Sequence, residues 1–120
     1  METNLIARFK SARSKAVPIV GIATPDPRAT MRNIMQTTNG AAVLLWDCAA
    51  GLQGVNAAGR DVVNAVYGDM QPEMLTNAAE LLTMAVKFPA KSILFCSNFD
   101  RFISNEFVAQ AVWNLRDLYK

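Results

Sequence analysis

The chain has 120 residues, of which 52% are hydrophobic and 18% are charged, and its formal net charge is +2. This length is typical of a single domain, and this balance is typical of a folded globular protein rather than a disordered segment or a disulfide scaffold. The small net charge gives no electrostatic argument for binding nucleic acid. The absence of histidine excludes Ser-His and Cys-His nucleophile pairs within the chain.

No apolar stretch approaches the ~20 residues that are needed to cross a bilayer, and the N-terminus lacks the pattern of a secretory signal. The expected location is therefore the cytoplasm. Cys48 and Cys96 both fall at the ends of expected strands, and we interpret them as small core residues. Two cysteines without histidine do not make up an ordinary four-ligand zinc site.

The first expected element is an amphipathic helix over residues 1–16. Its apolar residues recur at helical spacing and are Leu5, Ile6, Phe9, Ala12 and Ala16. Basic residues occupy much of the opposite side and are Arg8, Lys10, Arg13 and Lys15. Such a run is more often a solvated helix face than a nucleic-acid site. These four residues are kept as candidate residues for an interaction. Residues 17–120 are expected to form an α/β core.

Three apolar stretches, each leading to an aspartate, predict buried strands over residues 17–24, 42–46 and 92–97. Helices are expected over about 27–37, 62–68, 72–88 and from Ser104 to the end. In the last helix the residues expected to face inward are Phe107, Val108, Ala111, Val112, Leu115, Leu118 and Tyr119.

The segment between Asp47 and Arg60 is expected to be a loop, because it holds Gly51, Gly54 and Gly59 within nine residues. A glycine-rich loop after a strand can hold phosphate on its backbone amides, but this one lacks the lysine and hydroxyl that would reach the outer phosphates and Mg²⁺. The geometry of the connection is the preferred explanation for the three glycines.

Strands separated by helices are joined by crossovers, which favours parallel pairing. We therefore expect an α/β fold, a three-layer sandwich with a small, mostly parallel sheet of at least three strands covered by helices. Residues 1–120 are expected to form one such domain. The last helix supplies a crossover that no further strand uses, so we expect the chain to be part of a larger protein.

The aspartates at the strand ends allow two interpretations. Ligands of open α/β sheets bind outside the carboxyl ends of the strands, so Asp26, Asp47 and Asp100, with Gly51 and Gly54, are candidate residues for binding a cofactor or Mg²⁺. The preferred alternative is that each aspartate caps its own loop, as Asp26 can do before a proline. Asp47 has no obvious capping role.

No strand is followed by a GxxxxGK[ST] phosphate loop, a GxGxxG fingerprint or a GxSxG elbow. We therefore assign no catalytic residue and no metal ligand.

Four segments, at residues 15–34, 43–56, 92–103 and 111–120, together resemble the N-terminal region that precedes the ATPase module in a group of divergent AAA-type ATPases. This is the plastid and cyanobacterial open-reading-frame-like group. The resemblance is carried by the T-x-D turn at 24–26, by Trp46-Asp47 with Gly51-Leu52, and by the L-R-D triplet at 115–117.

The resemblance implies a degenerate relative of the ATPase core that lacks Walker A, with Ser97-Asn98 in place of the acidic pair of Walker B. ATP and Mg²⁺ would belong to the following module of the parent protein, and none is expected in this chain. The implied function is that of a non-catalytic N-terminal domain that acts in assembly or in binding a substrate or adaptor.

The expected partners are other proteins or further copies of the chain, reached through the basic first helix and an unpaired sheet edge, because an exposed edge invites pairing. Nucleic acid and membranes are not expected as partners. The alternative function is that of a small α/β protein that binds a nucleotide or Mg²⁺ at the acidic strand ends.

Overall fold

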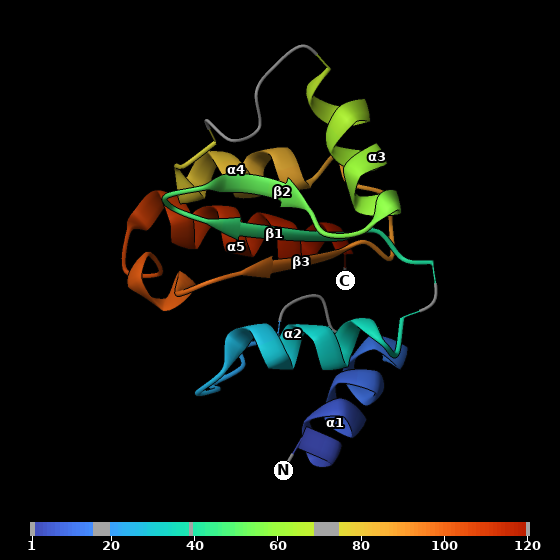
Figure 1. Ribbon diagram of the computed structural model, residues 1–120. Helices are drawn as coiled ribbons and strands as arrows, with labels where there is room; N and C mark the ends of the chain where they lie inside the picture. The colour runs from blue at the N-terminus through green and yellow to red at the C-terminus, as the bar shows by residue number, and fades with distance from the viewer. Residues whose placement is uncertain (1, 16–19, 39, 69–74, 120) are drawn as a thin grey trace.

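The computed structural model describes residues 2–15, 20–38, 40–68 and 75–119 (Figure 1). Its elements are, in chain order, α1 (Glu2–Ser14), α2 (Pro27–Met35), β1 (Val43–Asp47), β2 (Gly51–Gly54), α3 (Ala57–Tyr67), α4 (Ala78–Ala85), β3 (Ile93–Cys96), a 3-10 turn (Phe99–Arg101) and α5 (Glu106–Tyr119). The α/β class and a three-stranded sheet with helices packed against it are thus confirmed.

The sheet has the strand order β2-β1-β3 and is mixed. β1 and β3 pair in parallel, with Leu45 opposite Phe95, as expected for strands joined by a crossover. β1 and β2 form an antiparallel hairpin, with Asp47 opposite Gly51. The third strand of the sheet is therefore β2 and not the predicted strand at 17–24.

Two sequence predictions are wrong at this point. Residues 20–24 form no strand, and residues 16–19 lie outside the described part of the chain. Val20 is 46% exposed, and Thr24 turns the chain into α2, since its hydroxyl accepts from the Asp26 N–H and bonds the Thr30 hydroxyl at 2.8 Å. The predicted loop at 48–59 instead holds β2 and the start of α3.

Two glycines of that segment, Gly54 and Gly59, allow the backbone of neighbouring elements to pack closely. A Cβ on Gly59 would overlap the carbonyl oxygen of Val43, and a Cβ on Gly54 would overlap the backbone of Arg60. Asn56 caps α3 by accepting from the Gly59 N–H at 2.7 Å, and its side chain also bonds the backbone of Val43 and Ala41. α3 therefore begins at Ala57, five residues before the predicted start, and lies directly against β1 and β2.

The main core lies between α3, α4 and α5 and one face of the sheet, and α4 and α5 pass behind the sheet in Figure 1. The strands contribute Leu44 and Trp46 to this face. Trp46 is fully buried, its Nε1 donates to the carbonyl oxygen of Leu75 at 2.7 Å, and its ring meets Phe99 and Phe102 edge-on at 6.0 and 5.6 Å.

The helices differ from their predicted extents mainly in α4. It spans Ala78–Ala85 instead of 72–88, because Asn77 caps it by accepting from the Glu80 N–H. The predicted start at Pro72 lies outside the described residues. The last helix is confirmed as α5, and Val108 and Leu115 face the core as predicted.

The prediction that Phe107 and Leu118 face inward is wrong, because they are 70% and 56% exposed. They lie about three turns apart on one side of α5, whereas α4 covers the side that carries Val108 and Leu115. The side chain of Tyr119 lies outside the description. No described helix is long and apolar enough to cross a membrane.

Candidate functional site

The carboxylate of Asp47 is occupied by its own turn. Its Oδ1 accepts from the N–H groups of Ala49 and Ala50, at 2.8 and 2.6 Å. These two hydrogen bonds, that from Ala50 first, hold the pKa of Asp47 below its ordinary value of 3.8. Asp47 therefore caps the hairpin between β1 and β2, a role that was not obvious without knowledge of β2.

The other two aspartates lie in different settings. Asp26 is the N-cap of α2 and accepts from the Ala29 N–H at 3.2 Å. Asp100 is exposed in the 3-10 turn after β3, at the same end of the parallel pair as Asp47. Since residues 20–24 form no strand, Asp26 does not end a strand of this sheet.

The candidate cofactor residues do not form a loop around a ligand. Gly51 and Gly54 are the two ends of β2, and Gly51 adopts a φ of +79° at the tight turn. Among the described residues, no group of three or more acidic or cysteine side chains lies where it could hold a metal ion.

The two cysteines are free thiols in contrasting environments. Cys96 packs against the main core, and burial raises the pKa of its thiol to about 12, which leaves it protonated and unreactive. Cys48 is exposed at the β1–β2 turn, so the interpretation of this residue as part of the core is wrong.

A hollow of about 480 Å³ lies between α3 and the segment after α4. It is lined mainly by aliphatic side chains of α3 and contains one acid, Asp61, and one amine, Lys87. No ion pair joins these two groups, and no nucleophile lies beside them, so we assign no chemistry to the hollow.

The basic residues of the first helix take two roles. Arg8, Lys10 and Lys15 are exposed, whereas Arg13 is half-buried and its Nη2 donates to the carbonyl oxygen of Lys91 at 2.9 Å. Arg13 thus ties the end of α1 to the segment that leads into β3.

α2 adds two exposed cations, Arg28 and Arg32, that the sequence analysis did not single out. Within the described part of the chain, no ion pair neutralises the basic residues of α1 or α2. Residues 1–36 carry six basic and two acidic residues, or +4, and the remainder carries six basic and eight acidic residues, or −2. The charge of the molecule is therefore divided between its two parts.

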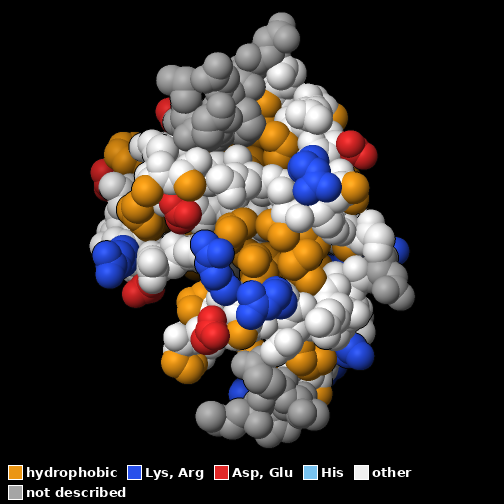
Figure 2. Space-filling model, in the orientation of Figure 1, with side chains coloured by type: hydrophobic (Ala, Val, Ile, Leu, Met, Phe, Trp, Pro, Cys, Tyr) orange, Lys and Arg blue, Asp and Glu red, His pale blue; other side chains and the backbone are white. Residues whose placement is uncertain are grey.

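The face of the sheet opposite the main core is only partly covered. Because side chains alternate along a strand, this face carries Val43 and Ile93, which are buried, and Leu45 and Phe95, which are half-buried neighbours across the parallel pair. Figure 2 shows hydrophobic side chains gathered in the middle of the view, with Lys and Arg side chains beside them.

In the orientation shared by Figures 1 and 2, this area lies where β3 and α2 are seen. On α2, Met31 and Met35 are half-buried, and Arg28 and Arg32 are exposed.

The outer side of α5 forms a second amphipathic area, which we call the α5 surface. Its apolar residues are Phe107, Trp113 and Leu118, of which Trp113 is 53% exposed. The guanidinium of Arg116 lies 3.8 Å from the centroid of the Trp113 ring and pairs with Asp117 at 3.5 Å. An exposed pair of this kind contributes little stability.

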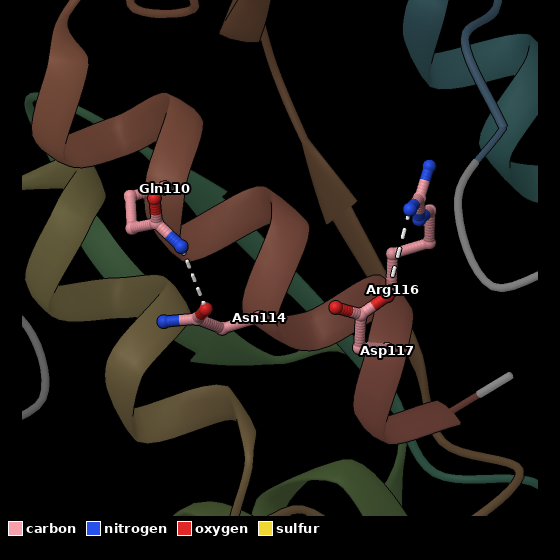
Figure 3. A network of polar contacts seen from close by, with 4 residues as sticks. All are labelled: Gln110, Asn114, Arg116 and Asp117. Atoms are coloured by element: carbon pink, nitrogen blue, oxygen red, sulfur yellow. Dashed lines mark hydrogen bonds and ion pairs between the residues drawn. The ribbon is translucent and has the colours of Figure 1, made fainter.

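The rest of the α5 surface is polar or acidic. The Gln110 amide donates to Asn114 Oδ1 at 3.0 Å, one turn along the helix (Figure 3). Glu106 and Asp117 are exposed near the two ends of the helix. The sequence pattern had assigned Phe107 and Leu118 to the core, so this surface becomes visible only once the packing of α5 is known.

A comparison of the chain with protein-family models, with curated proteins and with solved structures finds no match.

Proposed function

We propose that this chain is a non-catalytic interaction domain that acts in assembly or in binding a substrate or adaptor protein. The observation that supports this function is the outer side of α5, which carries three large apolar residues, Phe107, Trp113 and Leu118, that are all more than half exposed. Single exposed apolar residues are ordinary, but three large ones on one helix favour a binding surface. Tryptophan is enriched where proteins bind each other most strongly.

The same proposal includes the parent protein. The motifs at 24–26, 46–52 and 115–117 resemble the region before the ATPase module of divergent AAA-type ATPases, so the domain would precede such a module, which would bind ATP and Mg²⁺. The coding sequence downstream of Lys120 tests this directly. A GxxxxGK[ST] motif in the same reading frame is expected, and a stop codon directly after Lys120 would contradict it.

The alternative function, binding of a nucleotide or Mg²⁺, has no observation in its favour. Asp26 and Asp47 already accept backbone hydrogen bonds. Titration calorimetry with Mg²⁺ and ATP is expected to show no heat of binding. Saturable binding that is lost in Asp100→Ala would instead support the alternative.

The interaction function is tested by photo-crosslinking in the cells that express the protein. Gln110, in the middle of the α5 surface, is replaced by the photo-reactive amino acid p-benzoylphenylalanine, and exposed Asn64 of α3 is replaced in the same way as a control. We expect a discrete protein adduct from position 110 alone. No adduct from position 110, or the same adducts from both positions, would contradict the proposal.

A further inference from the structure

We propose that the outer side of α1 binds an acidic segment of a partner protein. We call this side the α1 surface and define it by its exposed residues, namely Ala7, Arg8, Lys10, Ser11, Ser14 and Lys15. It belongs to a different helix from the α5 surface, so it adds a second binding surface to the proposed function. The inference depends on how α1 is packed, on the charge that it presents and on the size of the basic area.

The packing of α1 separates two sides of the helix. At 3.6 residues per turn, the exposed positions from Ala7 to Lys15 fall within about 160° of the helix. The other side carries five half-buried residues, namely Leu5, Ile6, Phe9, Ala12 and Arg13. On that side Arg13 Nη2 donates to the carbonyl oxygen of Lys91 at 2.9 Å, and α1 contacts α2. α1 is therefore held by one side, and the α1 surface faces outward.

The last cation of this surface is part of the same helical geometry. Lys15 follows directly after α1, and its N–H donates to the carbonyl oxygen of Ser11 at 3.1 Å, as in a further helical residue. The Ser14 hydroxyl also donates to this carbonyl oxygen, at 2.8 Å. Arg8 and Lys15, seven residues apart, thus lie on one side of a continuous helical backbone.

The charge of the α1 surface is positive and uncompensated. Arg8, Lys10 and Lys15 have no acidic residue beside them on this surface and form no ion pair within the described part of the chain. Helix faces that only meet water are commonly stabilised by acidic and basic residues at i,i+4 spacing, and this face has none among its described side chains. The residues between the cations are alanine and serine, which are too small to cover them.

α2 extends the basic area, because Arg28 and Arg32 are exposed one turn apart on the helix that α1 contacts. Complementary charge attracts a partner and orients it before contact. Arginine also offers a fork of N–H groups that matches a carboxylate. An acidic partner therefore fits both the charge and the hydrogen-bonding groups of this area.

The size of the basic area favours a short protein segment. Arg8 and Lys15 are about 10 Å apart along the helix, a length that an extended segment of about four residues covers. Residues 37–120 carry a net charge of −2, so a long nucleic acid would also lie over an acidic part of the molecule. The described α1 surface carries no large apolar residue that could insert into a membrane.

The test measures the binding of a fluorescein-labelled peptide of eight glutamates to the full chain by fluorescence anisotropy at 50 mM NaCl. Arg8→Glu/Lys15→Glu reverses the charge of the α1 surface. Arg60→Glu/Arg101→Glu makes the same change of charge at exposed positions elsewhere and is the control. Arg8→Gln/Lys15→Gln is a milder variant that removes the charges without reversing them, and circular dichroism verifies that all variants keep their helix content.

The natural chain and the control are expected to bind the peptide with similar affinity. Charge reversal on the α1 surface should weaken binding at least tenfold, and the glutamine variant should weaken it at least threefold. A natural chain that does not bind the peptide overturns the proposal. An equal loss in the control also overturns it, because the net charge of the molecule rather than the α1 surface would then attract the peptide.

Two further probes test the class of partner. A single-stranded oligonucleotide of 30 nucleotides and vesicles that contain phosphatidylserine are expected to bind more weakly than the peptide. Tighter binding of either probe, lost in Arg8→Glu/Lys15→Glu, would assign the α1 surface to nucleic acid or to anionic lipid and overturn the assignment to protein.

Crosslinking from position 110 is independent of this test. Peptide binding without an adduct from position 110 would support the α1 surface and remove the α5 surface. An adduct from position 110 without peptide binding would leave the proposed function standing and overturn the present inference.

Discussion

The side chain of Asp47 shows how a residue that resembles part of a ligand site can be a purely local support. Its carboxylate accepts two backbone hydrogen bonds at the β1–β2 turn. Hydrogen bonds to a charged acceptor are stronger than those to a neutral acceptor. We expect Asp47→Ala to lower the free energy of unfolding by about 1 kcal/mol. Urea denaturation measures this change, and Asp61→Ala, which removes an exposed carboxylate without such bonds, is the control.

The pH dependence of Asp47 follows from the direction of its pKa shift. Because the folded-state pKa lies below 3.8, the ionised form stabilises the fold above pH 4, and this contribution is lost as the pH falls through the folded-state pKa. We therefore expect the difference in stability between the natural chain and Asp47→Ala to shrink in acid. A difference that stayed constant down to pH 2 would contradict this explanation.

Tyr67 carries a buried hydroxyl without a hydrogen-bond partner within the described chain. Burial raises its pKa from 10.0 to about 12, so the unfolded chain ionises first and stability is lost as the pH rises from 10 to 12. We expect Tyr67→Phe to be neutral or up to about 1 kcal/mol more stable, because it removes an unpaired polar group, and to lose stability less steeply over this range. Thermal unfolding at pH 7 and pH 11 tests both expectations.

At the scale of elements, the contact between α3 and β1 depends on the absence of a side chain. We expect Gly59→Ala to cost about 1–3 kcal/mol, because its Cβ would overlap the Val43 carbonyl oxygen, although alanine is the better helix former. Gly21→Ala, where the added Cβ meets nothing within 4 Å, should change stability by less than about 0.5 kcal/mol. Equal effects of the two substitutions would disprove the close-packing role.

α1 is joined to the sheet region by the Arg13 guanidinium. We expect Arg13→Ala to increase amide hydrogen exchange throughout α1, whereas Arg8→Ala, which removes an exposed cation of the same helix, should leave exchange unchanged. Faster exchange in both variants would mean that general helix propensity, rather than this hydrogen bond, holds α1 in place.

The elements also show what the sequence could predict. Periodicity identified α1, α2 and α5, and the apolar runs at 42–46 and 92–97 gave the parallel pair. It failed at β2, because a four-residue strand with glycine at both ends has little apolar pattern, and its pairing depends on a turn that Asp47 caps. Sequence periodicity also failed at residues 20–24, where an apolar run forms no strand of the sheet.

The sequence prediction of the candidate site succeeded and failed for similar reasons. The capping role of Asp26 followed from the proline after it, and this local prediction is confirmed. The exposure of Phe107 and Leu118 depends instead on how much of α5 is covered by α4, which is a tertiary contact. Sequence periodicity shows that a side of a helix is apolar but does not show what covers it.

At the scale of the whole molecule, the first two helices are basic and the remainder is acidic. Salt should weaken the binding of an acidic segment to the basic part, since the Debye length falls from about 10 Å at 0.1 M to about 3 Å at 1 M. We expect the dissociation constant of the glutamate peptide to rise severalfold between 50 and 500 mM NaCl, as measured by fluorescence anisotropy. Binding that strengthens with salt would indicate a contact held by apolar burial alone.

The contrast between the two tryptophans gives the protein a pair of internal optical reporters. Trp46 is sealed in the core and bonded to Leu75, whereas Trp113 is half exposed under the guanidinium of Arg116. Iodide in solution can collide with the indole of Trp113 but not with that of Trp46. Quenching of the accessible fraction therefore monitors assembly, while the protected emission monitors unfolding, so the two processes can be followed separately in one unlabelled sample.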